Sequence, residues 1–208
     1  MFLLRLIREG GPVMWIILIC SIVSLFVFLM KVFQFHREEI NVRELLRGLF
    51  NVLKREGLVE AITLCDHTPG PAAKLLGAAI IAYQRGDEDI RAAIDEAALE
   101  EIPKLERHLN ILSTLGFVMP LIGLFGTVIA MIKAFEAVRV SLSSTAIAGA
   151  VAMALISTAS ALAVAIPCYI GYNYLLSRVN TITLDMEKAA LEITAFFERR
   201  RKNNPEKK

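Results

Sequence analysis

Two long uncharged segments dominate the sequence and limit what the chain can fold into. They span residues 109–132 and 140–177, and the only charged residues between them are Lys133, Glu136 and Arg139. A helix crosses the hydrocarbon core of a bilayer with about 20 apolar residues, so each segment is long enough to span a membrane. The sequence therefore predicts a transmembrane helical hairpin in the second half of the chain.

Small and hydroxyl-bearing residues interrupt both apolar segments. The first segment has three glycines followed by a threonine, and the second has three hydroxyl residues among alanines: Gly116, Gly123, Gly126 and Thr127, then Ser157, Thr158 and Ser160. Small residues let helix backbones approach closely in lipid, and hydroxyls can form hydrogen bonds between helices. We therefore expect a tightly packed pair with a hydroxyl-lined face, in which Gly123 and Gly126 serve packing. Pro120 and Pro167 are expected to kink the two helices, with neighbouring helices satisfying the freed backbone groups.

The composition favours a membrane protein and argues against several other classes. The chain has 208 residues, 55% of them hydrophobic, and a formal net charge of +2; its mean hydropathy is +0.54. No basic-aromatic patch indicates nucleic-acid binding. The three cysteines show neither CxxC nor Cys/His spacing, so free thiols and no metal site are expected. No phosphate-binding loop, zinc-protease motif or nucleophile elbow occurs, so we expect neither an enzyme nor a cofactor.

The amino-terminal region predicts a first transmembrane helix. Residues 1–8 form a short amphipathic segment with Arg5 and Arg8, expected to lie at the membrane surface, and Gly10, Gly11 and Pro12 break it. Residues 13–30 are then uncharged. A signal peptide is the alternative, but the apolar run is long and no A-x-A-like cleavage site follows it. Trp15 near one end suits an interfacial anchor.

Between residues 31 and 108 the pattern changes to amphipathic helices. Apolar residues recur at helical spacing around residues 45–53, a Thr-Pro-Gly-Pro turn covers residues 68–71, and a helix over residues 72–83 should end near Gly86. Asp87 is expected to cap the next helix, which Pro103 is expected to kink. No loop pattern follows Arg107, so we expect this helix to continue unbroken into the second membrane segment.

The apolar periodicity continues past the third membrane segment. Residues at steps of three or four are apolar, namely Val179, Ile182, Met186, Ala189, Ile193 and Phe197. This pattern predicts that the third membrane helix projects into water as an amphipathic extension, followed by a basic tail. The predicted fold class is therefore all-α, a polytopic membrane protein with three transmembrane helices, two of them extended into a helical aqueous domain.

The predicted segments and their orientation follow from hydropathy and charge. The segments are an amphipathic amino-terminal stretch (1–12), a first membrane helix (13–30), a helical domain (31–108), a second membrane helix (109–135), a short loop (136–144), a third membrane helix (145–177) and a helical extension with basic tail (178–208). The helical domain and the tail share a side because two spans separate them, and they hold 19 of the 23 lysines and arginines. The positive-inside rule places that side in the cytoplasm and the amino terminus outside.

Thr127 and Thr158 are the polar residues of most interest in the membrane segments. Each hydroxyl either bonds back to its own helix, as membrane threonines often do, or faces an interior partner or a file of water. Intramembrane carboxylates usually mark proton relays, and neither segment has an ionisable group in its interior. If the chain moves protons, another chain must therefore supply the group that titrates.

At these residues the chain resembles the ExbB/TolQ/MotA family, the channel-forming subunits of ion-driven motors in bacterial inner membranes. The stretch 123–128 with Met131 resembles the second-helix motif of the family, and residues between Ala154 and Asn173 resemble the third-helix motif. Gly10, Gly11 and Pro12 before the first helix are typical of short ExbB-like members. Three spans and this loop order resemble ExbB and TolQ more than MotA.

The resemblance implies a function, partners and site residues. It implies a homopentamer around two transmembrane helices of an ExbD/TolR-like single-span partner, whose aspartate carries the proton. Thr127 and Thr158 match the family threonines that line the pore. Met153 stands where ExbB and TolQ usually have a glutamate, which puts a proton-relay role for that position in doubt. Ala161 and Ala130 stand where the family has glycines.

Several alternatives stay open from the sequence. A non-conducting membrane scaffold that oligomerises through its small-residue helices would have the same glycines and threonines. Sodium is an alternative to the proton as the transported ion. The envelope process that would be energised, whether iron uptake, envelope constriction or secretion, is not encoded in any motif of the chain.

Overall fold

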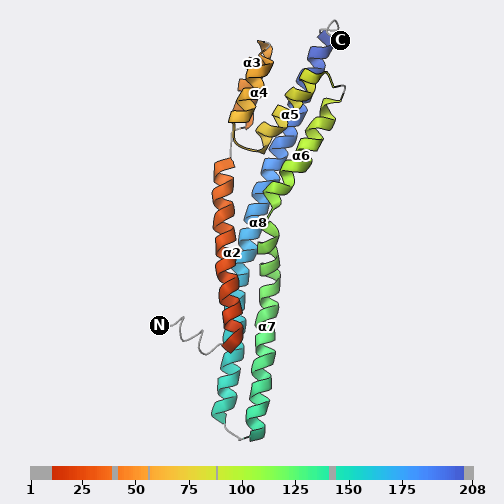
Figure 1. The fold of residues 1–208 in the computed structure, drawn as a ribbon. Helices are drawn as coiled ribbons and strands as arrows, with labels where there is room; N and C mark the ends of the chain where they lie inside the picture. The colour runs from red at the N-terminus through yellow and green to blue at the C-terminus, as the bar shows by residue number, and fades with distance from the viewer. Residues whose placement is uncertain (1–10, 39–41, 56, 88, 141–143, 204–208) are drawn as a thin grey trace. The chain divides into compact units, whose positions relative to one another are not determined.

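The fold is entirely helical in the residues that the structure describes. The computed structural model describes residues 11–38, 42–55, 57–87, 89–140 and 144–203, and these form seven α-helices and no strand (Figure 1). The helices are α2 (Gly11–Glu38), α3 (Val42–Lys54), α4 (Leu58–His67), α5 (Pro71–Arg85), α6 (Ile90–Glu106), α7 (Leu109–Val140) and α8 (Ser144–Asn203). Helices α2, α7 and α8 each contain a stretch long and apolar enough to cross a membrane. The predicted all-α fold with three such helices is thus confirmed, whereas the predicted amphipathic segment at residues 1–8 lies outside the described residues.

The chain forms two compact units. The first unit comprises residues 1–31 and 108–175, and the second comprises residues 32–107 and 176–208. Helices α2 and α8 each begin in the first unit and end in the second. The amphipathic extension that the apolar periodicity predicts after residue 178 is part of α8, which continues without a break to Asn203.

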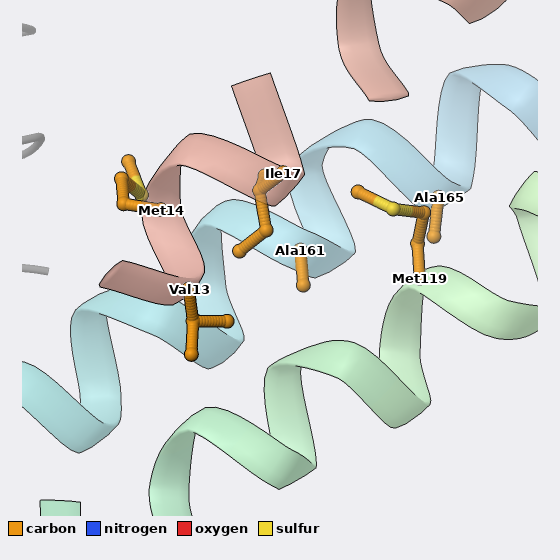
Figure 2. Close-up of a cluster of buried hydrophobic side chains, with 6 residues drawn as sticks. All are labelled: Val13, Met14, Ile17, Met119, Ala161 and Ala165. Atoms are coloured by element: carbon orange, nitrogen blue, oxygen red, sulfur yellow. The ribbon is translucent and has the colours of Figure 1, made fainter. Parts of the chain in front are cut away.

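In the first unit, α2 packs on the pair formed by α7 and α8. Figure 2 shows the buried cluster that joins the three helices, made of Val13, Met14 and Ile17 from α2, Met119 from α7, and Ala161 and Ala165 from α8. The alanines leave room for the larger side chains of α2. The outward side chains of α2 are large and apolar, including Trp15 and Phe26 at 60% and 68% exposure, which suits contact with lipid.

In the second unit, α3 to α6 and the carboxyl-terminal part of α8 each bury apolar side chains. Its buried residues are Leu46, Leu49 and Leu53 (α3), Ala61 and Cys65 (α4), Leu75, Leu76, Ala79 and Ile80 (α5), Ile90, Ile94 and Leu105 (α6), and Val179, Met186, Ala189, Ile193 and Phe197 (α8). The amphipathic patterns predicted for these helices are therefore confirmed, although α4 was not predicted as a separate helix. Burial, followed by the nearby charge of Asp66, raises the pKa of the Cys65 thiol to about 11, so this thiol stays protonated at neutral pH.

The last turns of α8 are fixed to the rest of the second unit by aromatic contacts and arginines. The ring of Phe197 stacks on Tyr83 with centroids 4.2 Å apart. The Arg200 guanidinium donates a hydrogen bond to the Leu53 carbonyl at 2.7 Å, and that of Arg201 donates to the Asp87 carbonyl. Leu53 lies in the last turn of α3, where carbonyls lack helical donors, so Arg200 caps that helix end.

Two local predictions about the ends of α6 were wrong. The expected continuous helix from α6 into α7 is broken, because α6 ends at Glu106 and α7 begins at Leu109. His108 has a left-handed backbone (φ 70°), a conformation in which histidine is several-fold enriched among non-glycine residues. The amino-terminal cap of α6 is Asp89, whose carboxylate accepts a hydrogen bond from the Ala92 amide at 3.1 Å. The predicted cap, Asp87, instead belongs to the end of α5. It follows the left-handed Gly86, and its amide donates a hydrogen bond to the Ala82 carbonyl.

A carboxylate of α6 gives the second unit a pH-dependent contribution to its stability. Glu101 is 8% exposed and accepts hydrogen bonds from Lys74 of α5 at 3.0 Å and from Lys104 at 2.6 Å. Burial acts to raise the pKa of Glu101, but the hydrogen bonds and charges of the two lysines outweigh it and lower that pKa below its ordinary 4.5. The lysine side chains are about 60% exposed and remain hydrated when the carboxylate is removed.

We expect Glu101→Gln to lower the free energy of unfolding of the second unit by about 1 kcal/mol at pH 7, since a hydrogen bond to a charged group is lost and the lysines stay solvated. A depressed pKa stabilises the fold above the unfolded-state value of 4.5 and ceases to do so as pH falls through the folded-state value. The difference between wild type and variant in thermal denaturation should therefore shrink below about pH 4. A difference that grows on acidification would contradict this account.

Candidate functional site

The two helices of the membrane hairpin approach most closely at the glycines of α7. A Cβ atom placed on Gly123 would lie 2.7 Å from the Ala161 Cβ and 3.1 Å from the Thr158 Cα, and one on Gly126 would lie 2.7 Å from the Ser157 Oγ. Real Cβ atoms essentially never lie 2.7 Å from another heavy atom, so glycine at both positions permits this separation of the backbones. We refer to Gly123 and Gly126 of α7 with Ser157 and Ala161 of α8 as the glycine seam.

The seam continues along an antiparallel register. Gly116 lies against the backbone of Tyr169, ahead of the contacts of Gly123 with Ala161 and of Gly126 with Ser157. Beyond Gly126, small residues stay buried on both helices, with Ala130 on α7 fully buried and Ala154 on α8 at 7% exposure. Ala161 lies opposite Gly123 and also belongs to the buried cluster with Ile17 and Met119.

The two threonines that the sequence indicated as pore residues flank the glycine seam, and each hydroxyl has a defined acceptor. The Thr158 hydroxyl donates across the hairpin to the Gly123 carbonyl at 3.2 Å. The Thr127 hydroxyl donates to the Leu124 carbonyl of its own helix at 2.6 Å. Of the two alternatives left open by the sequence, the bond within the helix holds for Thr127, whereas Thr158 bonds to the neighbouring helix. Both side chains remain partly exposed on this chain.

Ser157, which the sequence grouped with Thr158 and Ser160 on a hydroxyl-lined face, is the hydroxyl residue buried between the two helices. It is 1% exposed, and its hydroxyl donates to the Ala154 carbonyl at 2.9 Å. Because its Oγ and Cβ face Gly126, Ser157 belongs to the interior of the hairpin while its neighbour Thr158 lies at the edge. Ser157 and Ala161 are one helical turn apart on α8, and they face Gly126 and Gly123 on α7. This matched spacing of small residues on the two helices is the sequence pattern that could have indicated the buried position of Ser157.

The remaining residues named from the sequence lie around this seam. Pro120 is partly buried in α7 and Pro167 is exposed on α8, and both helices are continuous through them. The methyl group of Met153 lies against Gly11, at the start of α2, where the backbone has φ +69°. Any Cβ on residue 11 would overlap that methyl group, so Met153 forms part of the packing between α8 and α2. Among the described residues, no group of three or more His, Cys, Asp or Glu side chains could hold a metal ion.

We expect Met153→Leu to preserve assembly and activity. Neither side chain titrates, and exchanging methionine for leucine at a packing position usually costs less than about 1.5 kcal/mol. The measurement is the melting temperature of the purified protein together with the ion flux of its reconstituted complex. Loss of flux with an unchanged melting temperature would show that position 153 has a role in the ion pathway.

These features define a class of protein. The chain has three apolar helices long enough to cross a membrane, and two of them pack together at a glycine seam with hydroxyl groups at its edge. It is therefore a multi-pass helical membrane protein. The model of the MotA/TolQ/ExbB proton channel family matches residues 69–188, which is more than half of the chain. The chain belongs to this family.

Individual relatives agree with the family assignment. An ExbB homolog of Methanothermobacter thermautotrophicus is 26% identical over 178 residues, which cover 85% of this chain and 64% of that protein. The Tol-Pal system protein TolQ of Haemophilus influenzae is 39% identical over 109 residues, covering 51% of this chain and 48% of TolQ. The biopolymer transport protein ExbB of Neisseria meningitidis is 26% identical over 211 residues, covering 91% of this chain and 94% of ExbB. The chain thus spans less than two thirds of the length of the first two relatives and nearly all of the third.

Proposed function

We propose that the chain is the channel-forming subunit of a motor driven by the proton-motive force in a bacterial inner membrane. Its work would be done on periplasmic or outer-membrane components, together with an ExbD/TolR-like single-span partner. The main support for this proposal is the glycine seam in a chain that belongs to a proton-channel family. Thr127 and Thr158, which match the pore threonines of that family, lie partly exposed at the edge of the seam. In this proposal the two threonines line the pore, and the partner's membrane aspartate carries the proton.

The proposal requires several copies of the chain. Three membrane helices cannot enclose a pore, so the threonine faces of symmetry-related copies must surround it, and closed rings are the usual form of such assemblies. The number five and the two partner helices at the centre come from the family resemblance. The proposed orientation has the amino terminus outside and the second unit in the cytoplasm, because 19 of the 23 lysines and arginines lie in residues 31–108 and 178–208.

The experiment that tests the proposal is co-expression with a single-span protein that has an aspartate in its membrane helix and is encoded in a neighbouring reading frame. Native mass spectrometry in mild detergent should show a ring of this chain with the partner bound, and a cysteine introduced at Lys208 should be labelled only from the cytoplasmic side. A partner variant with asparagine in place of the aspartate should still assemble but not conduct. A monomer with and without lipid, or labelling from the periplasm, would contradict the proposal.

A non-conducting oligomeric scaffold is the second function to be tested. The glycine seam supports it equally, because close helix packing serves assembly as well as conduction. The scaffold predicts a ring that forms without a partner aspartate and shows no ion flux in any combination. Flux measurements on the complex therefore separate the two functions.

A further inference from the structure

A groove in the second unit lies between α6 and the carboxyl-terminal part of α8. Its volume is about 340 Å³, and its lining includes the buried apolar side chains of Ile94 and Met186. The charged residues that line it are Arg91 and Asp95 from α6 and Glu187 from α8. All three are exposed, and none forms an ion pair with another residue in the described ranges. The groove therefore offers an apolar surface with two carboxylates and one guanidinium at its rim.

Helix α3 has the complementary charges on its outward face. Its buried leucines define the inward side, and the opposite side is exposed, with Arg43, Glu44 and Arg47 in its first half. These two guanidiniums and one carboxylate match the charges at the groove with opposite sign. Gly48 follows on the same side of the helix, and nothing lies within 4 Å of a Cβ placed on it. Glycine weakens the interior of a helix, and no packing within the single chain accounts for it here.

Helix α3 does not reach this groove in its own chain. The short helices of the second unit contact one another in chain order, α3 with α4, α4 with α5, and α5 with α6, so α3 and α6 lie at opposite ends of the row. Figure 1 shows the same order, with α3 and α4 on one side of α5 and α6 on the other. When a surface at one end of a unit fits a surface at the other end, copies associate head to tail, and such contacts close into rings.

We propose that the groove between α6 and α8 binds the outward face of α3 from a neighbouring copy of this chain. The interface rests on the proposed function, which requires a ring, and it specifies the contact that joins the copies in the second unit. Arg43 of one copy pairs with Glu187 of the next, and Arg47 pairs with Asp95. The arginine stems cover the apolar lining of the groove while their guanidiniums remain at the rim.

Two contacts fix the level of α3 along α8 within each chain. The ring of Phe50 stacks on Phe196 with centroids 5.1 Å apart. Three residues further along α3, the Leu53 carbonyl accepts a hydrogen bond from the Arg200 guanidinium at 2.7 Å. The two contacts advance together along both helices, so α3 and α8 run in the same direction.

The two arginines of α3 lie at the level of the groove. Both helices rise about 1.5 Å per residue, so residues 43–47 of α3 lie at the level of about residues 189–193 of α8. The groove extends along α8 over residues 183–194 and includes this level. Copies in a closed ring are related by rotation without a shift along the axis, and membrane-spanning helices tilt on average only about 20° from the membrane normal. The ring therefore presents α3 of one copy at the height of the groove of the next.

Cross-linking in membranes that contain the co-expressed complex tests the contact. Cysteines introduced by Arg43→Cys and Glu187→Cys in the same chain report it when a short bis-maleimide is added. We expect chains joined to their neighbours, seen as a ladder of multimers on a denaturing gel. The matched control combines Arg43→Cys with Glu100→Cys, because Glu100 is exposed on α6 but does not line the groove. It should give no more product than the chain without introduced cysteines.

Charge reversal at the other pair tests whether the charges recognise each other. In the reporter chain, Arg47→Asp or Asp95→Arg alone places like charges across the contact and should lower the yield of cross-linked product by roughly three- to tenfold. The two reversals together restore opposite charges and should restore the yield. Higher ionic strength should lower the yield of the reporter chain, because exposed ion pairs are screened by salt.

Three results would overturn the inference. The first is no cross-link between positions 43 and 187 in rings that native mass spectrometry shows to be intact. The second is a yield that neither charge reversal changes. The third is a cross-link from position 187 to a different protein, which would assign the groove to another partner. Absence of any ring in the wild type, in contrast, contradicts the proposed function itself.

Discussion

Gly123→Ala should destabilise the first unit by about 1–3 kcal/mol, a typical cost of inserting a methyl group into a fully packed core. The added Cβ would lie 2.7 Å from the Ala161 Cβ and 3.1 Å from the Thr158 Cα. The second of these is a backbone atom that cannot turn aside, so α8 itself must move away from α7. The same movement would lengthen the bond from Thr158 to the Gly123 carbonyl, which is already 3.2 Å. We therefore expect a lower melting temperature in detergent together with partial loss of assembly.

Gly149→Ala is the control for this substitution, because no atom lies within 4 Å of a Cβ at that position of α8. Alanine is favoured over glycine inside a helix by about 1 kcal/mol, so this variant should be as stable as the wild type or more so. If Gly123→Ala lowers the melting temperature and Gly149→Ala leaves it unchanged or raises it, the close contact at the glycine seam is the cause of the loss. Equal destabilisation by both would show that glycine is needed for a reason other than the contact between α7 and α8.

The purified oligomer without a partner should not conduct protons at a measurable rate. Between residues 109 and 132 and between 140 and 177 the polar side chains are hydroxyls, a cysteine, tyrosines, Asn110 and Asn173. Threonine and serine do not titrate near neutral pH, and an ordinary tyrosine titrates near pH 10. A charge at the centre of the bilayer costs about 3 kcal/mol even on the mildest scales, so a proton without a carrier should cross at least roughly tenfold more slowly than in the complex.

A pH-sensitive dye inside liposomes measures this difference, with the oligomer alone compared against the oligomer plus partner at the same protein density. A protonophore added at the end shows that the vesicles held their gradient, and a sodium-sensitive dye in parallel identifies the ion. Uptake by the oligomer alone at the rate of the complex would show that a water file suffices and that no partner carboxylate is needed.

The helical plan of the protein could be predicted from sequence because it depends on local patterns. The lengths of the uncharged segments located the three stretches that could span a membrane, and the Thr-Pro-Gly-Pro turn and Gly86 located the start and the end of α5. The break between α6 and α7 was missed because it depends on a left-handed histidine, His108, and not on glycine or proline. Helix α7 also runs on to Val140, through part of the segment predicted as a loop, because residues 136–140 contain no residue that stops a helix.

The site could be predicted in kind but not in detail. Glycines and hydroxyls near the middle of the membrane segments indicated a close helix pair, and the family resemblance indicated Thr127 and Thr158. Which hydroxyl lies inside the pair depends on the rotation of α8 against α7. Patterns in a single sequence do not determine that rotation, so Ser157 was grouped with Thr158 and Ser160 and was not predicted to be the buried one. The acceptors of the two threonines, Leu124 and Gly123, likewise depend on that rotation.

Helix α8 and the segment from α6 to α7 differ in the continuity of their backbone hydrogen bonds. Helix α8 has 60 residues without a break, and its last turns are held by the contacts of Arg200 and Phe197. Between α6 and α7 the helical ladder stops and starts again, because the Arg107 amide closes α6 on the Pro103 carbonyl at 2.9 Å and the Ile111 amide bonds to the His108 carbonyl at 3.2 Å. A local opening at residues 107–108 therefore breaks few hydrogen bonds, whereas an opening in the middle of α8 must break a full helical turn.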